Sequence, residues 1–283
     1  MANQLALMAH CNRGDSVVVP RGSHMVLFET GAAAAIAGVQ LFEVGTDGLF
    51  DGDDVRSVYR GNAYISPPTR LVVVENTHNN AGGRVTRPDR WAHIVDGARG
   101  LGIPVHVDGA RIGHAALASN VSPRELCAGA ASASLCLSKA LGAPAGSVLV
   151  GDAPFIERAR RFRRMLGGGM RQVGILAAAG LYALDNHWAG LADDHRRASA
   201  LAAGLRELAS LQVEGGGAET NIVIVALPGP AAALVERLGH HGVRCMAFGE
   251  RRVRFVFHRE VSDGAVTGAL AALQASVKDL GWR

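Results

Sequence analysis

Short apolar runs rich in valine alternate with helix-like stretches along the first half of the chain. We predict strands in six of these runs: 16–20, 38–44, 70–75, 103–108, 134–138 and 146–151. The stretches between them have helical features, and one of them, 88–101, begins with Pro88 at a plausible first turn. Near-continuous apolar strands joined by helices are typical of a parallel sheet covered on both faces. The sequence therefore predicts an α/β fold with a mostly parallel sheet.

The pattern changes after about residue 185. A long amphipathic stretch, 188–208, is followed by four short strand-like runs, "LQVE", "NIVIVAL", "RCMAF" and "VRFVFH". Two further helical segments, 230–241 and 262–279, are interleaved with these runs. We therefore predict two domains, a large one over 1–186 and a smaller α+β domain over 187–283.

Hydropathy, charge and cysteine spacing exclude several classes of protein. No apolar run approaches the roughly 18–20 residues of a membrane helix, and no signal peptide is visible, so we expect a soluble cytoplasmic protein without a membrane partner. The formal net charge of +4 is too small to indicate nucleic-acid binding. The five arginines in 156–166 are interpreted as a solvated or subunit-contact face, with RNA binding as the alternative. The four cysteines lack metal-type spacing, which favours reduced thiols and no metal site.

Polar side chains follow three consecutive predicted strands where each strand ends. The strand 70–75 is followed by His78, the strand 103–108 ends in Asp108 shortly before Arg111, and the strand 134–138 is followed by Lys139. Ligands of open α/β sheets bind outside the carboxyl ends of the strands. If the three strands share one sheet, a lysine, an aspartate, an arginine and a histidine converge on one edge.

Lys139 is unusual because the chain has only two lysines, and the other, Lys278, lies close to the C-terminus. A lysine, unlike an arginine, can lose its proton when desolvated and attack a carbonyl carbon. Pyridoxal 5'-phosphate (PLP) needs such a lysine, together with an acidic partner for its pyridine nitrogen, and Asp108 fits the second role. A surface lysine and an ordinary turn aspartate are the alternatives. The phosphate needs backbone N–H groups or an arginine, which "MLGGGMRQ" (165–172) offers through its glycines and Arg171.

Four motifs in this order resemble the threonine aldolase family: "ENTHN", "HVDGARIGHA", "CLSKALGAPAGSVLVG" and "RRMLGGGMRQVGILAAAGLYAL". The resemblance is greatest to the low-specificity L-threonine aldolase branch, runs from residue 1 to about 190, and continues more loosely to the C-terminus. It implies a PLP-dependent enzyme of the aspartate aminotransferase fold, fold type I. The implied activity is that of an aldehyde-lyase, which cleaves L-threonine and L-allo-threonine to glycine and acetaldehyde in a retro-aldol reaction. A homodimer or homotetramer is also implied.

The resemblance implies a role for each matching residue. Lys139 matches the Schiff-base lysine and Asp108 the partner of the pyridine nitrogen. Arg111 matches an arginine that holds the substrate carboxylate, and Arg171 matches a phosphate ligand. Arg254, in "RRVRFVFH", is the best match for a second carboxylate-binding arginine, with Arg251 and Arg252 as alternatives.

Two histidines match active-site positions of the family. His24 corresponds to a histidine stacked on the cofactor ring, and His78 to a second active-site histidine. His24 lies in "VPRGSHM", which reads like an expression-vector linker; because family-like sequence flanks it on both sides, we interpret it as native. Either imidazole could take the proton of the substrate's β-hydroxyl group. Taken alone, without the resemblance, each histidine is more typical of a satisfied loop or core residue.

The start of the chain departs from the family pattern. In the family, the stretch that matches "MANQLAL" follows a Ser-Gly-Thr turn that contributes to phosphate binding. A start codon assigned at an internal methionine is our preferred explanation, and a truncated product is the alternative. Two other functions stay open: another PLP-dependent β-eliminating lyase on the same scaffold, and a non-catalytic subunit that serves as an interaction partner.

Overall fold

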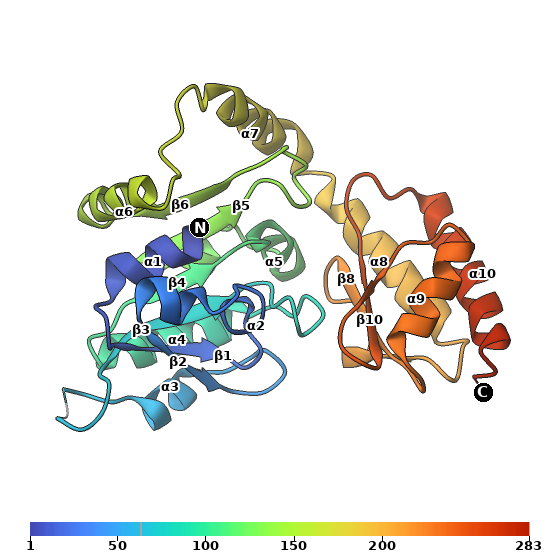
Figure 1. Ribbon diagram of the computed structural model, residues 1–283, viewed down its shortest axis with the longest axis horizontal. Coiled ribbons are helices and arrows are strands. Elements are labelled where there is room, and N and C mark those ends of the chain that lie inside the picture. The colour runs from blue at the N-terminus through green and yellow to red at the C-terminus, as the bar shows by residue number, and fades with distance from the viewer. Residues whose placement is uncertain (63, 283) are drawn as a thin grey trace. The chain divides into compact units, whose positions relative to one another are not determined.

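The computed structural model describes residues 1–62 and 64–282, which form two compact units (Figure 1). The first unit contains Met1–Asn80 and Arg84–Asn186, and the second contains Ala81–Gly83 and the chain from His187 onward. Among the described residues, no helix is both long and apolar enough to cross a membrane.

The first unit is built on a six-stranded sheet with the order β2-β1-β3-β4-β5-β6. Its strands are β1 (Ser16–Pro20), β2 (Gln40–Val44), β3 (Thr69–Glu75), β4 (Val105–Asp108), β5 (Ser132–Cys136) and β6 (Ser147–Gly151). The first five are mutually parallel, and β6 pairs antiparallel with β5. This topology confirms the predicted α/β fold with a mostly parallel sheet.

The strand β5 begins and ends two residues earlier than the apolar pattern predicts. Its pairing with β4 starts at the small residue Ser132, opposite His106, and the strand ends at Cys136. Lys139 therefore lies in the turn after the strand rather than directly at its end. A prediction based on the two leucines of this run misses the small residues at the start of the strand. These residues pair with β4 through their backbone groups, whatever the size of their side chains.

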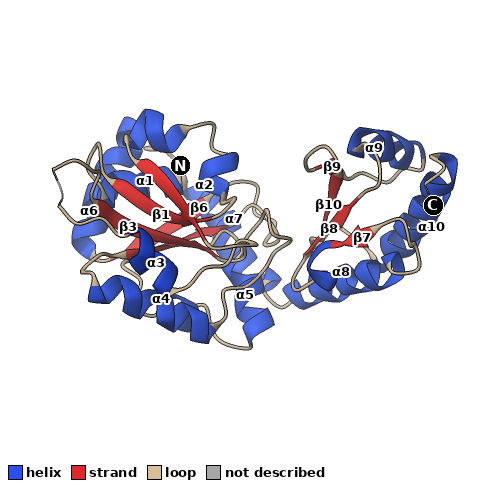
Figure 2. Cartoon of the chain, turned by 90° about the horizontal axis from the view of Figure 1, so that it is seen from below, coloured by secondary structure: helices blue, strands red, loops and turns tan. Residues whose placement is uncertain are grey.

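Helices cover both faces of the sheet (Figure 2). The helices α3 (Gly52–Val58), α4 (Pro88–Gly100) and α5 (Ile112–Ser119) lie on one face, and α1 (Ala2–His10) and α2 (His24–Leu27) lie on the other. The core follows the two-residue period of a strand, because Val72 and Val74 join the cluster of the first face while Leu71 and Val73 join that of the second. The helix α6 (Ala153–Met165) packs on α1, and α7 (Gly174–His187) follows it. Shorter helical turns are η1 (Ala33–Ala37) and η2 (Glu125–Cys127).

Two glycines allow α3 and α4 to approach each other closely. A Cβ atom on Gly52 would lie 2.3 Å from the carbonyl oxygen of His93, and one on Gly97 would lie 2.8 Å from the Cα atom of Gly52. Gly52→Ala is therefore expected to lower the free energy of unfolding by roughly 1–3 kcal/mol, since the helices must separate. Urea denaturation measures this loss. Gly100→Ala is the matched control, because a Cβ atom at the end of α4 meets nothing within 4 Å; equal losses in both variants would contradict the explanation.

The second unit contains a four-stranded antiparallel sheet with the order β7-β8-β10-β9. Its elements are α8 (Leu191–Leu205), β7 (Gln212–Val213), η3 (Glu214–Gly216), β8 (Ile222–Ala226), α9 (Ala231–His240), β9 (Met246–Ala247), β10 (Arg252–Val256) and α10 (Asp263–Asp279). Val253 and Phe255 of β10 join the core that the three helices form. Because side chains alternate along a strand, Arg252 and Arg254 lie on the opposite face.

Candidate active site

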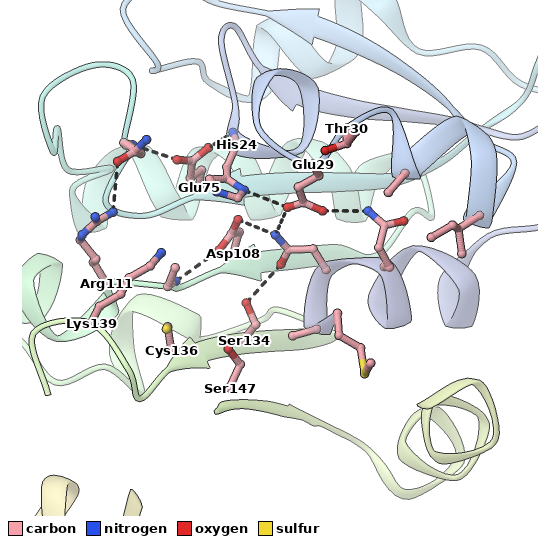
Figure 3. A pocket seen from close by; sticks show the side chains of 18 of the residues that line it. His24, Glu29, Thr30, Glu75, Asp108, Arg111, Ser134, Cys136, Lys139 and Ser147 are labelled. Carbon is pink, nitrogen blue, oxygen red and sulfur yellow. Dashed lines mark hydrogen bonds and ion pairs between the residues drawn. The ribbon is translucent and has the colours of Figure 1, made fainter. Parts of the chain in front are cut away.

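Three neighbouring strands carry a row of polar side chains near their carboxyl ends. Glu75 of β3 pairs with Asp108 of β4, and Asp108 pairs with Ser134 of β5. Leu71 and Val73, four and two residues before Glu75, belong to the core on the α1 side of the sheet. The row therefore faces α1, whose first turn lies beside it (Figure 3).

A cavity of about 600 Å³ lies over this row, in the size range of small-molecule sites. Four of the predicted site residues line it together: His24, Asp108, Arg111 and Lys139 (Figure 3). The first four residues of the chain, which include the start of α1, also line it. All of its lining residues belong to the first unit. The structure thus brings together residues that are more than one hundred positions apart in the sequence.

Asp108 is buried and held by two donors. Its Oδ2 atom accepts a hydrogen bond from the Asn3 side-chain amide at 2.8 Å, and its Oδ1 atom accepts one from the Ala110 backbone at 3.2 Å. The same Asn3 nitrogen donates to Glu29 at 2.7 Å, and the Asn3 oxygen accepts from the Ser134 hydroxyl at 3.4 Å. These bonds fix both the position of the carboxylate and the orientation of the amide.

Glu75 is a buried carboxyl group that connects two loops of the site. Its Oε2 atom accepts from the backbone N–H of His24 at 2.6 Å, and its Oε1 atom accepts from that of Asn79 at 2.8 Å. The Asn79 side-chain oxygen accepts in turn from Arg111 at 3.3 Å. Burial and the nearby Asp108 raise the pKa of Glu75 to about 7, although both backbone bonds act against this. Glu75 therefore supports His24 and Arg111 at the same time.

Lys139 is half-buried at one end of the cavity, near Arg111 (Figure 3). Burial, and then the charge of Arg111, lowers the pKa of its amine, while Asp108 and Glu75 act in the opposite direction. A lowered pKa increases the neutral fraction of the amine, which is the nucleophilic form. The lysine singled out by its rarity in the sequence therefore has an environment that suits attack on a carbonyl carbon.

His24 and Glu29 form a hydrogen-bonded pair in the cavity wall, with 2.9 Å between His24 Nδ1 and Glu29 Oε1. This bond raises the pKa of His24, against the effect of burial. Burial would raise the pKa of Glu29, but hydrogen bonds from His24, Asn3 and Gln4 outweigh it and lower that pKa to about 2. Glu29 is therefore a carboxylate throughout the ordinary pH range.

Three predicted site residues lie elsewhere. His78 is fully buried, is not part of the cavity lining, and has a pKa lowered to about 4 by burial. Arg171 is exposed in the loop between α6 and α7. Arg254 belongs to the second unit, where its guanidinium group lies 4.6 Å from the centroid of the Phe248 ring. The alternative Arg252 forms a two-point ion pair with Glu214, with both distances at 2.7 Å.

Sequence reasoning missed Asn3, Glu29 and Glu75. Glu75 is the first residue of the "ENTHN" motif, and the two-residue alternation along β3 could have placed it on the same face as Leu71 and Val73. Glu29 follows His24 by five residues, and a carboxylate so close to a candidate base is a signal worth testing. Asn3 had no such signal, because only the packing of α1 brings it to Asp108.

Solved structures with the same arrangement of a mostly parallel sheet and a smaller antiparallel sheet identify the fold as the aspartate aminotransferase fold, fold type I. A solved aspartate aminotransferase variant from Thermus thermophilus matches with a TM-score of 0.71 and 18% identity, over 96% of this chain and 76% of that one. Leishmania major threonine aldolase matches with a TM-score of 0.80 and 18% identity, over 97% of this chain and 81% of that one.

The chain belongs to the beta-eliminating lyase family, whose family model matches residues 1–228. It is also 34% identical over 287 residues to low-specificity L-threonine aldolase 1 of Arabidopsis thaliana. That alignment covers 98% of this chain and 80% of the relative. The resemblance seen in the four sequence motifs is thereby confirmed.

Proposed function

We propose that the chain is a PLP-dependent low-specificity threonine aldolase that cleaves L-threonine and L-allo-threonine to glycine and acetaldehyde. One observation carries this proposal: a single cavity holds the Lys139 amine, the fixed Asp108 carboxylate and the Arg111 guanidinium. The name and the 34% identity of the Arabidopsis relative support the substrate.

The residues of the cavity fit PLP. Lys139 is a partly desolvated amine that can bind the aldehyde carbon, and Asp108 is a fixed carboxylate that can keep a pyridine nitrogen protonated. The N-terminus of α1 lines the same cavity, and helix N-termini bind phosphate groups through their free N–H groups. When bound, PLP supplies an electron sink for the electron pair released by cleavage of the Cα–Cβ bond.

The remaining steps fall to the side chains of the cavity. Arg111 binds the substrate carboxylate, since its planar guanidinium group can donate two parallel hydrogen bonds. His24 takes the proton of the β-hydroxyl group as the carbonyl group of acetaldehyde forms. We assign this role to His24 rather than His78, because His24 lines the cavity and His78 does not.

We assign the large PLP-binding domain to residues 1–186 and the small domain to the chain from residue 187. Arg254 stays our candidate for the second carboxylate ligand, from its position in the "RRVRFVFH" motif. A cytoplasmic location stays a prediction from the sequence.

We also propose that the protein is a homodimer or homotetramer. Large apolar side chains around α7 are exposed, among them Ile175 (79%), Met165 (72%), Leu181 (62%) and Tyr182 (61%). Exposed apolar residues that gather on one segment are typical of a subunit interface. Arg171 lies in the same segment, so its proposed phosphate contact would be made across that interface.

The substrate is tested by offering the PLP-loaded protein L-threonine, L-allo-threonine, phenylserine and L-serine side by side. We expect acetaldehyde from both threonine isomers, detected by coupled reduction with NADH, and glycine in equal amount. Pyruvate from serine without acetaldehyde from threonine would indicate the β-eliminating alternative. A loaded protein that turns over none of the four would support the non-catalytic alternative.

A further inference from the structure

We propose that Glu29 is a positioning residue that orients the His24 imidazole. The Nδ1–H group of His24 donates a hydrogen bond to Glu29, which leaves Nε2 as the basic atom. This inference rests on the proposed function, in which His24 takes the β-hydroxyl proton. It concerns the atom at which that proton is held.

The hydrogen bonds around Glu29 determine the tautomer of His24. A carboxylate can only accept, so in the 2.9 Å contact His24 Nδ1 must carry the proton. Gln4 donates to the second carboxylate oxygen, Oε2, at 2.8 Å, and Asn3 donates to Oε1 at 2.7 Å. The Ser134 hydroxyl donates to the Asn3 oxygen, which directs the Asn3 amide nitrogen toward the carboxylates. Neutral His24 therefore carries its lone pair on Nε2.

The backbone on either side of the pair is also fixed. The His24 backbone N–H donates to Glu75 at 2.6 Å, so the histidine is held at its backbone and at its ring by two different carboxyl groups. Directly after Glu29 the chain turns through Thr30, with φ at 55°, and Gly31, with φ at 73°. A β-branched residue rarely adopts this left-handed conformation, which indicates a tightly specified turn at Glu29.

The charges that face His24 come from several elements. Glu29, Asp108 and Glu75 are acidic groups that favour its protonated form, and Lys139 and Arg111 are cations that line the same cavity. Among these groups only Glu29 has a hydrogen bond to the ring. An imidazole paired in this way accepts a proton at Nε2, and the adjacent carboxylate stabilises the imidazolium that results.

The first test does not require enzyme activity and uses the ¹⁵N-labelled chain of residues 1–283 without added PLP. Long-range ¹H–¹⁵N NMR spectra give the tautomer and the pKa of each histidine, and a His24→Asn variant identifies the signal of His24. We expect the neutral His24 to carry its proton on Nδ1. In Glu29→Gln the pKa of His24 should fall by about one pH unit or more, because the opposite charge is lost.

Glu43→Gln is the matched control. The Glu43 carboxylate accepts from the backbone of Gly22 at 2.6 Å, close to His24, but Glu43 does not line the cavity. This variant should leave the tautomer and pKa of His24 unchanged. A proton on Nε2 of neutral His24 in the unmodified protein, or an unchanged pKa of His24 in folded Glu29→Gln, would overturn the proposal; the first result does not depend on the Glu29 variant.

Activity of the PLP-loaded protein supplies the second readout. We expect Glu29→Gln to lower kcat for L-threonine by about 100-fold, within the range that general-base catalysis contributes, with little change in KM. The acid limb of its kcat/KM profile should move to lower pH, since the neutral form of His24 then persists to lower pH. Glu43→Gln should retain the kcat and the profile of the unmodified protein, and an unshifted profile in Glu29→Gln would overturn the proposal. If the unmodified protein cleaves no threonine, the proposed function fails, while the NMR result still decides whether Glu29 orients His24.

Discussion

Lys139→Ala is expected to lower threonine cleavage by about 10³-fold or more and to prevent covalent attachment of PLP to the chain. The variant removes the only amine among the side chains that line the cavity. It therefore removes the covalent step and any proton transfer by the lysine together. Lys139→Arg should be equally inactive, because arginine keeps the positive charge but does not release its proton. A loss in both variants assigns the effect to amine chemistry rather than to charge.

Attachment is measured separately from activity. The protein is incubated with PLP and reduced with borohydride, and the pyridoxyl group is located by peptide mass. The chain has only two lysines, so Lys278→Ala is the matched control. Lys278 lies in the last turn of α10, in the second unit. We expect the label on Lys139 in the unmodified protein and in the Lys278 variant. A folded protein that takes no label, or takes it on Lys278, would refute the assigned site.

The location of the site followed from a local rule. Parallel strands end at one edge of a sheet, and β3, β4 and β5 proved to be neighbours in that order. Asp108 and Lys139 could therefore be predicted from the positions of strand ends and from the rarity of lysine. The rule holds even where the bounds of β5 were wrong by two residues, since a short turn still brings Lys139 to the cavity.

The contacts that support the site could not be predicted in the same way. Asn3 reaches Asp108 across 105 positions of sequence, and that contact depends on how α1 packs over the sheet. Neither hydropathy nor strand alternation determines such packing. His78 illustrates the opposite limit, because a motif names the residue but not the direction of its side chain. Its ring is buried beside Glu75, with 3.9 Å between His78 Nε2 and Glu75 Oε2.

Asp108→Asn is expected to lower kcat by about 100-fold or more while PLP still attaches to Lys139. The substitution changes almost no volume, so the bond from the Ala110 backbone to Oδ1 can persist. The replaced oxygen, Oδ2, accepts from Asn3 at 2.8 Å in the native protein, and an amide there would set donor against donor. Because an amide has no charge, the variant loses the negative charge that keeps the pyridine nitrogen protonated. Each unit by which the pKa of that nitrogen falls corresponds to about 1.4 kcal/mol.

Three measurements separate this electrostatic effect from misfolding. Borohydride labelling should remain, kcat should fall, and the absorption spectrum of the bound PLP should change with its protonation state. Asp152→Asn is the matched control, because it removes a carboxylate of the same size outside the cavity, where Asp152 caps α6 through a 2.9 Å bond from the backbone of Phe155. That variant should keep kcat within a few-fold. If Asp108→Asn retained the native kcat, the reaction would not need a charged partner for the pyridine nitrogen at the end of β4. The hydrogen bonds to Asp108 would then stabilise only the structure.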